Sequence, residues 1–152
     1  MSSVRTTIPL GDIEIRFLVE SADSQGAATV FECEIRPDAK VPAPHSHDGF
    51  EETVYGLAGI TSFSVDGASH ELGLGDALVI RRGQVHQFVN QGTENSCFLS
   101  VATPGVFGPD YFLEIRDVLV ASAGGPPDLG ALLEVMQRHG LTPVAPAPAP
   151  AS

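Results

Sequence analysis

Apolar and polar residues alternate along much of the chain with a period of two, which is typical of half-buried β-strands. Residues 12–20 place Ile13, Ile15 and Phe17 on one face of such a strand. Residues 28–37 repeat the pattern, so we expect the two runs to form strands whose apolar faces share one core.

Turn residues separate further short runs of this kind through residues 52–104. The clearest turn signal is Asp66-Gly67, a dipeptide that favours a two-residue hairpin. The chain holds 16 Gly and 12 Pro, which is consistent with many turns. Short strands with turns every roughly 8–12 residues describe a sandwich or barrel. The pattern therefore predicts an all-β fold.

The periodicity becomes helical after Pro104. We predict one helix over residues 109–121, with Pro109 in its first turn, and a second over 129–139. Apolar residues of the second helix fall on one face: Leu129, Leu132, Leu133 and Met136.

These patterns suggest three segments. A barrel spans residues 1–104, and a helical extension over 105–140 packs on the barrel or on a partner chain. The Pro/Ala-rich residues 141–152 are expected to form an extended or disordered tail.

Composition narrows the class of protein. A length of 152 residues favours one domain, and a formal net charge of -11 argues against binding to nucleic acid or to anionic membranes. No apolar run approaches the ~20 residues that span a bilayer, and the first residues lack the apolar core of a secretory leader. We therefore expect a cytoplasmic protein whose partner is a small molecule.

Three histidines and a carboxylate form the candidate chemistry. His45 and His47 follow a proline-rich, extended segment, so both side chains point to the same face. Glu51 and Glu52 come next, and His86 lies in a separate strand-like run. Three imidazoles and one carboxylate can bind a divalent transition metal such as Fe, Ni, Mn, Cu or Zn. This set leaves coordination positions open, as catalytic sites require.

The spacing of these residues resembles the two sequence motifs of the cupin superfamily. In the first motif, His-x-His is followed after three or four residues by Glu and after six more by Gly. Here His45-x-His47 is followed after four residues by Glu52 and after six more by Gly59. The gap to Gly59 selects Glu52 over Glu51, which strand alternation sends to the opposite face.

The second motif runs Gly, five residues, Pro-x-Gly, two residues, His, three residues, Asn. Here Gly75, Gly83, His86 and Asn90 match it at the same spacing. Arg81 stands at the usual Pro position, and the leading Gly of the first motif is Ala39. Both departures fall on turn positions, not on ligand positions.

This resemblance implies a double-stranded β-helix, also called a jelly-roll or cupin barrel, with a metal ion inside. It assigns the metal-ligand role to His45, His47, Glu52 and His86. Glu52 would also serve as the catalytic proton acceptor. Small cupins of this kind commonly form homodimers, so we expect a homodimer.

Candidate pocket residues follow from the strand period and are less specific. Phe88 and Asn90 share a face with His86, and Gln84 has the same parity. Phe31 and Phe63 are apolar candidates for the pocket wall, although plain core packing would also explain the phenylalanines.

Three functions fit the sequence. The first is a metal-dependent dioxygenase, similar to small quercetinase-like cupins, that acts on an enediol, flavonol or phenolic substrate. The second is a non-redox isomerase, cyclase or lyase that uses the metal as a Lewis acid. The third is a cupin that binds a small molecule without turnover. The fold alone does not choose among them, because one fold hosts many chemistries.

Overall fold

The computed structural model describes residues 6–40 and 42–144. Its β-strands are β1 (Thr6–Leu10), β2 (Ile13–Val19), β3 (Thr29–Ile35), β4 (His45–His47), β5 (Glu51–Ala58), β6 (Thr61–Val65), β7 (Ala68–Leu72), β8 (Ala77–Ile80), β9 (His86–Val89), β10 (Ser96–Thr103) and β11 (Leu141–Pro143). A 3-10 helix, η1 (Ser21–Ser24), follows β2, and two α-helices, α1 (Pro109–Ala121) and α2 (Leu129–Arg138), lie between β10 and β11.

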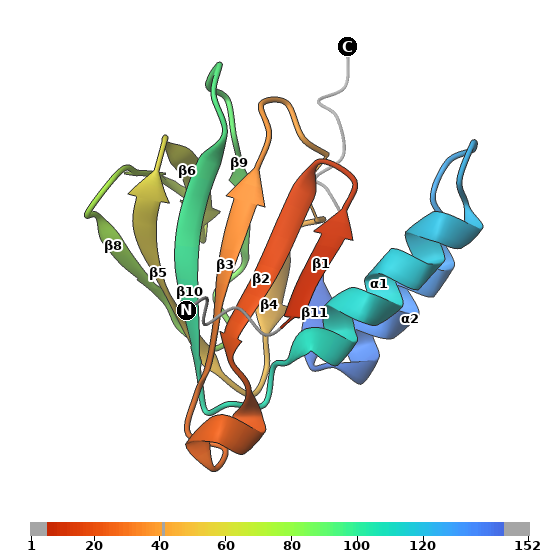
Figure 1. Cartoon of the computed structure of the whole chain (residues 1–152), viewed down its shortest axis with the longest axis horizontal. Coiled ribbons are helices and arrows are strands. Elements are labelled where there is room, and N and C mark those ends of the chain that lie inside the picture. Colours follow the sequence, from red (N-terminus) through yellow and green to blue (C-terminus); the bar gives the residue numbers. More distant parts are fainter. Residues whose placement is uncertain (1–5, 41, 145–152) are drawn as a thin grey trace.

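Two antiparallel sheets face each other and enclose the core (Figure 1). One sheet has the strand order β1-β2-β3-β10-β5-β8, and the other has the order β11-β4-β9-β6-β7. The apolar positions of β2 and β3 are buried and their polar neighbours are not, as the period of two predicts. The all-β jelly-roll fold with two C-terminal helices is therefore confirmed.

The hairpin between β6 and β7 turns at Asp66 and Gly67, as predicted. Both residues have positive φ, 47° and 82°, and Val65 pairs with Ala68 across the turn. Positive φ at both central residues is the type I′ geometry that Asp-Gly favours.

The two predicted helices are present, and both contact strands of the barrel. Helix α1 begins at Pro109 and packs on β1, where Tyr111 and Phe112 are buried. Helix α2 buries Met136 but leaves Leu129 exposed, because the α1–α2 hairpin extends past the edge of the sheet (Figure 1). Neither helix is long and apolar enough to span a membrane.

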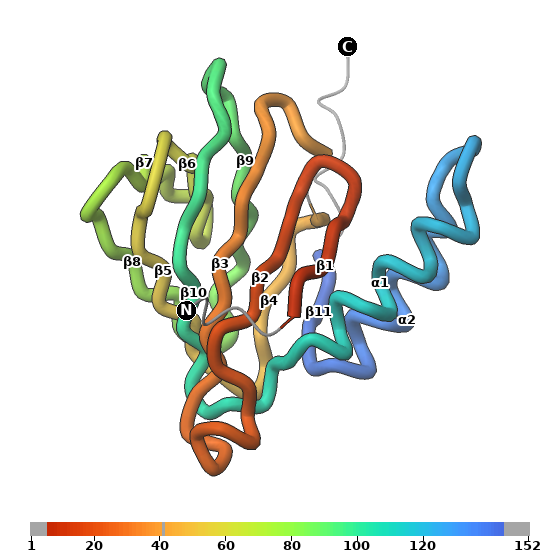
Figure 2. Tube along the Cα trace, viewed as in Figure 1, coloured from red at the N-terminus to blue at the C-terminus, as the bar shows by residue number. Residues whose placement is uncertain are grey.

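The predicted C-terminal tail does not begin at residue 141. Leu141–Pro143 form β11, which pairs antiparallel with β4, the strand that carries His45 and His47. Figure 2 shows these two segments side by side although about 95 residues separate them. Pattern analysis missed β11 because a three-residue edge strand is too short to show a period. Residues 145–152 of the predicted tail lie outside the described residues.

Candidate metal centre

The three predicted histidines meet inside the barrel. All of β4 is buried, and His45 pairs directly with His86 on β9. The ring centroid of His86 lies 4.6 Å from that of His45 and 4.5 Å from that of His47. Each ring offers one nitrogen, and the three nitrogens lie within 4.8 Å of one another. The fold thus converts two distant sequence motifs into one cluster of donors.

Backbone carbonyls orient two of the three rings. The Nδ1 atom of His45 donates to the carbonyl of Ala43 over 2.8 Å, and Nδ1 of His86 donates to the carbonyl of Gln84 over 3.0 Å. A carbonyl oxygen only accepts, so Nδ1 carries the proton in both rings. Nε2 then has a free lone pair, which is the usual state of a metal-binding histidine.

His47 is held by stacking. The ring of Phe50 lies 4.2 Å from it, with 21° between the ring planes. Nδ1 of His47 is buried and has no hydrogen-bond partner among the residues that the structure describes. A buried polar atom without a protein partner is rare, and a bound ion or water can satisfy it.

Burial keeps these imidazoles neutral. It lowers the pKa of His45 to about 4, with a further contribution from His86. Burial lowers the pKa of His47 to about 2, and the two neighbouring imidazoles make a smaller contribution in the same direction. The pKa of His86 is also lowered, chiefly by burial. Neutral nitrogen donors of this kind fit a divalent transition metal, whose identity stays a prediction.

Glu52 lies in the same cavity but outside the group of three imidazoles. On β5 it pairs with Ile80 and Ala102, both buried, so its side chain points inward. Burial raises the pKa of Glu52 to about 7, against a smaller opposing effect of Ser100. Its role as the fourth metal ligand stays a prediction.

Glu51 points the other way, as strand alternation predicts. Its carboxylate accepts a hydrogen bond of 2.8 Å from Nε of Arg82 on the outer side of the barrel. Arg82 is therefore the partner of Glu51 on the outer side of the barrel, and Glu52 is the glutamate that faces the cavity.

Two of the five candidate pocket residues line the cavity. Phe31 and Phe88 belong to its wall. Phe63, Gln84 and Asn90 do not, so these three pocket predictions need correction. Phe63 is buried behind the wall, where its ring centroid lies 5.8 Å from that of Phe88.

The side-chain amides of Gln84 and Asn90 form hydrogen bonds with the backbone at the two ends of β9. Oε1 of Gln84 accepts from the backbone N–H of Arg81 over 2.9 Å, a donor that a proline at this position would lack. Asn90 donates from Nδ2 to the carbonyls of Ile35 and Glu94 over 2.9 and 2.8 Å. Parity along β9 did not reveal these hydrogen bonds, because Gln84 and Asn90 flank the strand, where the backbone turns back within reach of their amides.

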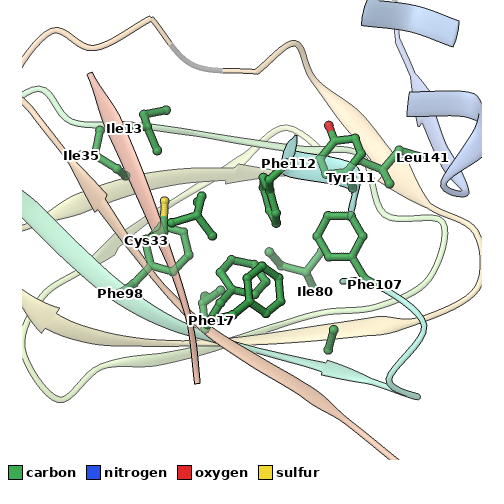
Figure 3. Close-up of a cluster of buried hydrophobic side chains, with 14 of the residues drawn as sticks. Ile13, Phe17, Cys33, Ile35, Ile80, Phe98, Phe107, Tyr111, Phe112 and Leu141 are labelled. Carbon is green, nitrogen blue, oxygen red and sulfur yellow. The ribbon is translucent and has the colours of Figure 1, made fainter. Parts of the chain in front are cut away.

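Sequence analysis missed the part of the wall that the C-terminal segment supplies. Phe107, Tyr111, Phe112 and Leu141 all line the cavity. Figure 3 shows these four side chains gathered at one end of the buried cluster. Three aromatic residues within residues 107–112 could have indicated a buried segment. The helical period shows that these residues share one face of a helix, but it does not show which part of the barrel that face packs on.

The buried histidines predict how the stability of the metal-free protein depends on pH. Below pH 6.5 the unfolded chain protonates His45 and His47, which the folded chain keeps neutral down to about pH 4, so acidification lowers the free energy of unfolding. The lowered pKa of His86 acts in the same direction. Glu52 acts in the opposite sense between pH 4.5 and about 7, because the folded chain keeps a proton there that the unfolded chain releases. His45 and His47 together outweigh Glu52, so we expect stability to fall from pH 6.5 towards about pH 5.

Urea unfolding of chelator-treated protein at several pH values measures this slope. His47→Gln removes one of the titrating groups, so the slope should decrease by an amount that grows from about 0.7 kcal/mol per pH unit at pH 6.5 to about 1.4 near pH 5. An unchanged slope in this variant would show that His47 is not held neutral in the fold.

Comparison with known proteins agrees with this geometry. Residues 31–102 match the family model of the cupin domain, and no curated protein matches the chain. The matched segment contains all four predicted ligands and most of both sheets. This segment of the chain is therefore similar to a cupin domain.

Solved structures with a similar fold include proteins with different described activities. The polyketide cyclase RemF from Streptomyces resistomycificus is 27% identical, with a TM-score of 0.57 over 66% of this chain and 73% of that chain. A conserved protein with a double-stranded β-helix domain from Klebsiella pneumoniae is 26% identical, with a TM-score of 0.56 over 69% and 89%. A predicted oxalate decarboxylase from Thermotoga maritima, 24% identical over 68% and 89% with a TM-score of 0.58, shares the fold.

Proposed function

We propose that this protein is a metal-dependent cupin enzyme that moves a proton on a small organic molecule. The observation that carries the proposal is the convergence of three neutral imidazoles in a largely apolar cavity that also holds the Glu52 carboxyl. A closed structural site would surround its ion with four protein ligands. Here the group that the fold brings together holds three imidazoles, which leaves a coordination position of a bound ion open to a substrate oxygen.

Each polar group of the cavity has a role in this proposal. His45, His47 and His86 would hold the ion, which when bound supplies Lewis acidity to a carbonyl or hydroxyl oxygen. Glu52 accepts a proton from the substrate and returns it at another position. In the metal-free chain the pKa of Glu52 is about 7, and a general base works best with a pKa near the ambient pH.

This assignment favours a non-redox reaction of the isomerase, cyclase or lyase type. The pKa of Glu52, about 7 inside this cavity, supports it, because such a carboxyl can take up and release a proton near neutral pH. Similarity to the cyclase RemF supports it as well.

A dioxygenase, the first expectation from sequence, is the second candidate. The apolar wall favours it, because an electron-rich phenol or flavonol would bind well there. The same wall would suit a binding protein without turnover.

Removal of oxygen separates these reaction classes. We expect turnover of a substrate found by screening carbonyl and phenolic compounds to continue in an anaerobic chamber at a rate within about twofold of that in air. The measurement is product formation by chromatography, with stirred aerobic samples as the reference. Turnover that stops without O2 and resumes on its return would identify a dioxygenase. Calorimetric binding with no product under either atmosphere would identify a binding protein.

A further inference from the structure

We infer that Asp66, at the tip of the β6–β7 hairpin, is a positioning residue for the metal centre. Its carboxylate holds the loop of residues 81–85, and this loop bonds two of the three proposed metal ligands. The inference rests on the proposed function, because it concerns the same three histidines. It adds a residue that lies outside the wall of the cavity.

The loop of residues 81–85 is in direct contact with two proposed ligands. The backbone carbonyl of Gln84 accepts the hydrogen bond from Nδ1 of His86 over 3.0 Å. The backbone N–H of Gly83 donates to the carbonyl of His47 over 3.0 Å. A movement of this loop would therefore change the direction of the His86 ring and would release the backbone of His47.

Asp66 extends the pairing of β6 with β9 into this loop. Val65 pairs with His86 where the two strands end, and the N–H of Asp66 then donates to the carbonyl of Val85 over 2.8 Å. Two residues paired in this way normally exchange two backbone hydrogen bonds. Here the chain turns away at Asp66, with a φ of 47°, and the N–H of Val85 donates to Oδ1 of Asp66 over 2.9 Å. The carboxylate thus takes the place of a backbone carbonyl beside a metal ligand.

The second carboxylate oxygen of Asp66 holds the side chain of Gln84. Oδ2 accepts from Nε2 of Gln84 over 3.2 Å. The other end of the same amide, Oε1, accepts from the N–H of Arg81 over 2.9 Å. The Gln84 amide is therefore fixed at both ends, and the backbone carbonyl of Gln84 is the group that orients His86. Asp66 acts on the metal centre through this residue and through Val85.

Asp66→Gly removes the carboxylate and keeps the hairpin turn possible, because glycine adopts positive φ without strain. Removal of an outer partner of a metal-binding histidine costs roughly 10- to 100-fold in metal affinity. Asp66 lies one bond further out, so we expect the affinity of the full-length chain for Co²⁺ to fall about tenfold. Absorption titration against a competing chelator measures this affinity. The visible bands of bound Co²⁺ should also shift, because they report the geometry of its ligands.

Asp66→Asn separates this role from the stability of the turn. Asn-Gly favours the hairpin turn as Asp-Gly does. The asparagine oxygen can accept from Val85, but its NH₂ group cannot accept from Gln84. We therefore expect partial recovery, to a Co²⁺ affinity about threefold below that of the original protein. A role in the turn alone would give the asparagine variant the full original affinity, and this comparison still decides if the glycine variant does not fold.

Asp76→Gly is the matched control. Oδ2 of Asp76 accepts from the N–H of Gly73 over 2.9 Å, in the loop between β7 and β8. The substitution makes the same chemical change in an exposed loop, and in the described part of the chain that loop forms no hydrogen bond with the three histidines. Co²⁺ affinity and spectrum should therefore stay as in the original protein.

The ring of His86 gives a further measurement that needs no metal. In the metal-free chain Nδ1 carries the proton, because it donates to Gln84. Long-range ¹H–¹⁵N NMR spectra distinguish the two neutral tautomers of a histidine ring. We expect one tautomer of His86 in the original protein and in Asp76→Gly. In Asp66→Gly the two ring nitrogens should move towards the shared shift of a mixture.

The outcomes separate this inference from the proposed function. Original Co²⁺ affinity, spectrum and His86 tautomer in Asp66→Gly would overturn the inference alone, and so would an equal loss in Asp76→Gly. An original chain that binds no Co²⁺ would overturn the proposed function. The positioning of His86 by Asp66 would then be decided by the tautomers of the two glycine variants.

Discussion

Replacement of His47 by alanine is expected to remove the bound metal. The variant loses one of three converging imidazoles, and two are too few to hold a divalent ion against buffer and chelator. We expect about one ion per chain in the original protein and roughly a tenth of that in the variant, because loss of a ligand costs more than the roughly 10- to 100-fold in affinity seen for outer partners. Elemental analysis of protein purified without added metal measures both values.

Two features of the structure make this variant informative. Nδ1 of His47 has no hydrogen-bond partner in the described part of the chain, so its removal leaves no new unpaired group. The matched control is His70→Ala, which removes an exposed histidine of β7 and should leave the metal content unchanged. Stoichiometric metal in the His47 variant would show that the cluster is not the metal site.

Replacement of Glu52 by glutamine is expected to separate catalysis from metal binding. The amide has almost the same shape but accepts no proton, so kcat should fall by about 10²- to 10⁴-fold, the usual contribution of a general base. Because the carboxyl lies outside the group of imidazoles, we expect the metal content to stay close to that of the original protein. Steady-state kinetics and elemental analysis on the same preparation test both parts.

Glu51→Gln is the control for this substitution, since it makes the same chemical change one residue away. Glu51 pairs with Arg82 outside the cavity, so both kcat and metal content should hold. A Glu52 variant that loses its metal would instead support the ligand role that the cupin motif assigns. A variant with full activity would refute both roles.

Local chemistry explains why the fold could be predicted from the sequence. The buried positions of β2 and β3 alternate because a strand sends successive side chains to opposite faces, and a half-buried sheet records this in its sequence. Asp66-Gly67 forms its predicted turn because few other dipeptides adopt positive φ twice in succession. The same alternation placed Glu52 inside and Glu51 outside.

The predictions that failed are those that placed Phe63, Gln84 and Asn90 in the cavity wall. Each of these side chains packs against or bonds to other parts of the barrel. Gln84 and Asn90 have the parity of His86, yet their amides bond to the backbone outside the cavity, Gln84 to Arg81 and Asn90 to Ile35. Phe63 is apolar and inward, as predicted, but a second layer of rings separates it from the cavity. Parity gives the face of a strand and does not give the distance from the centre of the barrel.

The sequence by itself determined the all-β class, the two helices and the identity of the three histidines. All of these depend on short-range periods and spacings that the chain carries locally. Only the tertiary structure decided how the cavity is closed. Phe107, Phe112 and Leu141 follow the matched cupin segment, and their place beside His47 depends on the pairing of β11 with β4 and on the hydrogen bond from the hydroxyl of Thr29 to the carbonyl of Phe107. Such long-range contacts are set by packing between segments, and no local pattern encodes them.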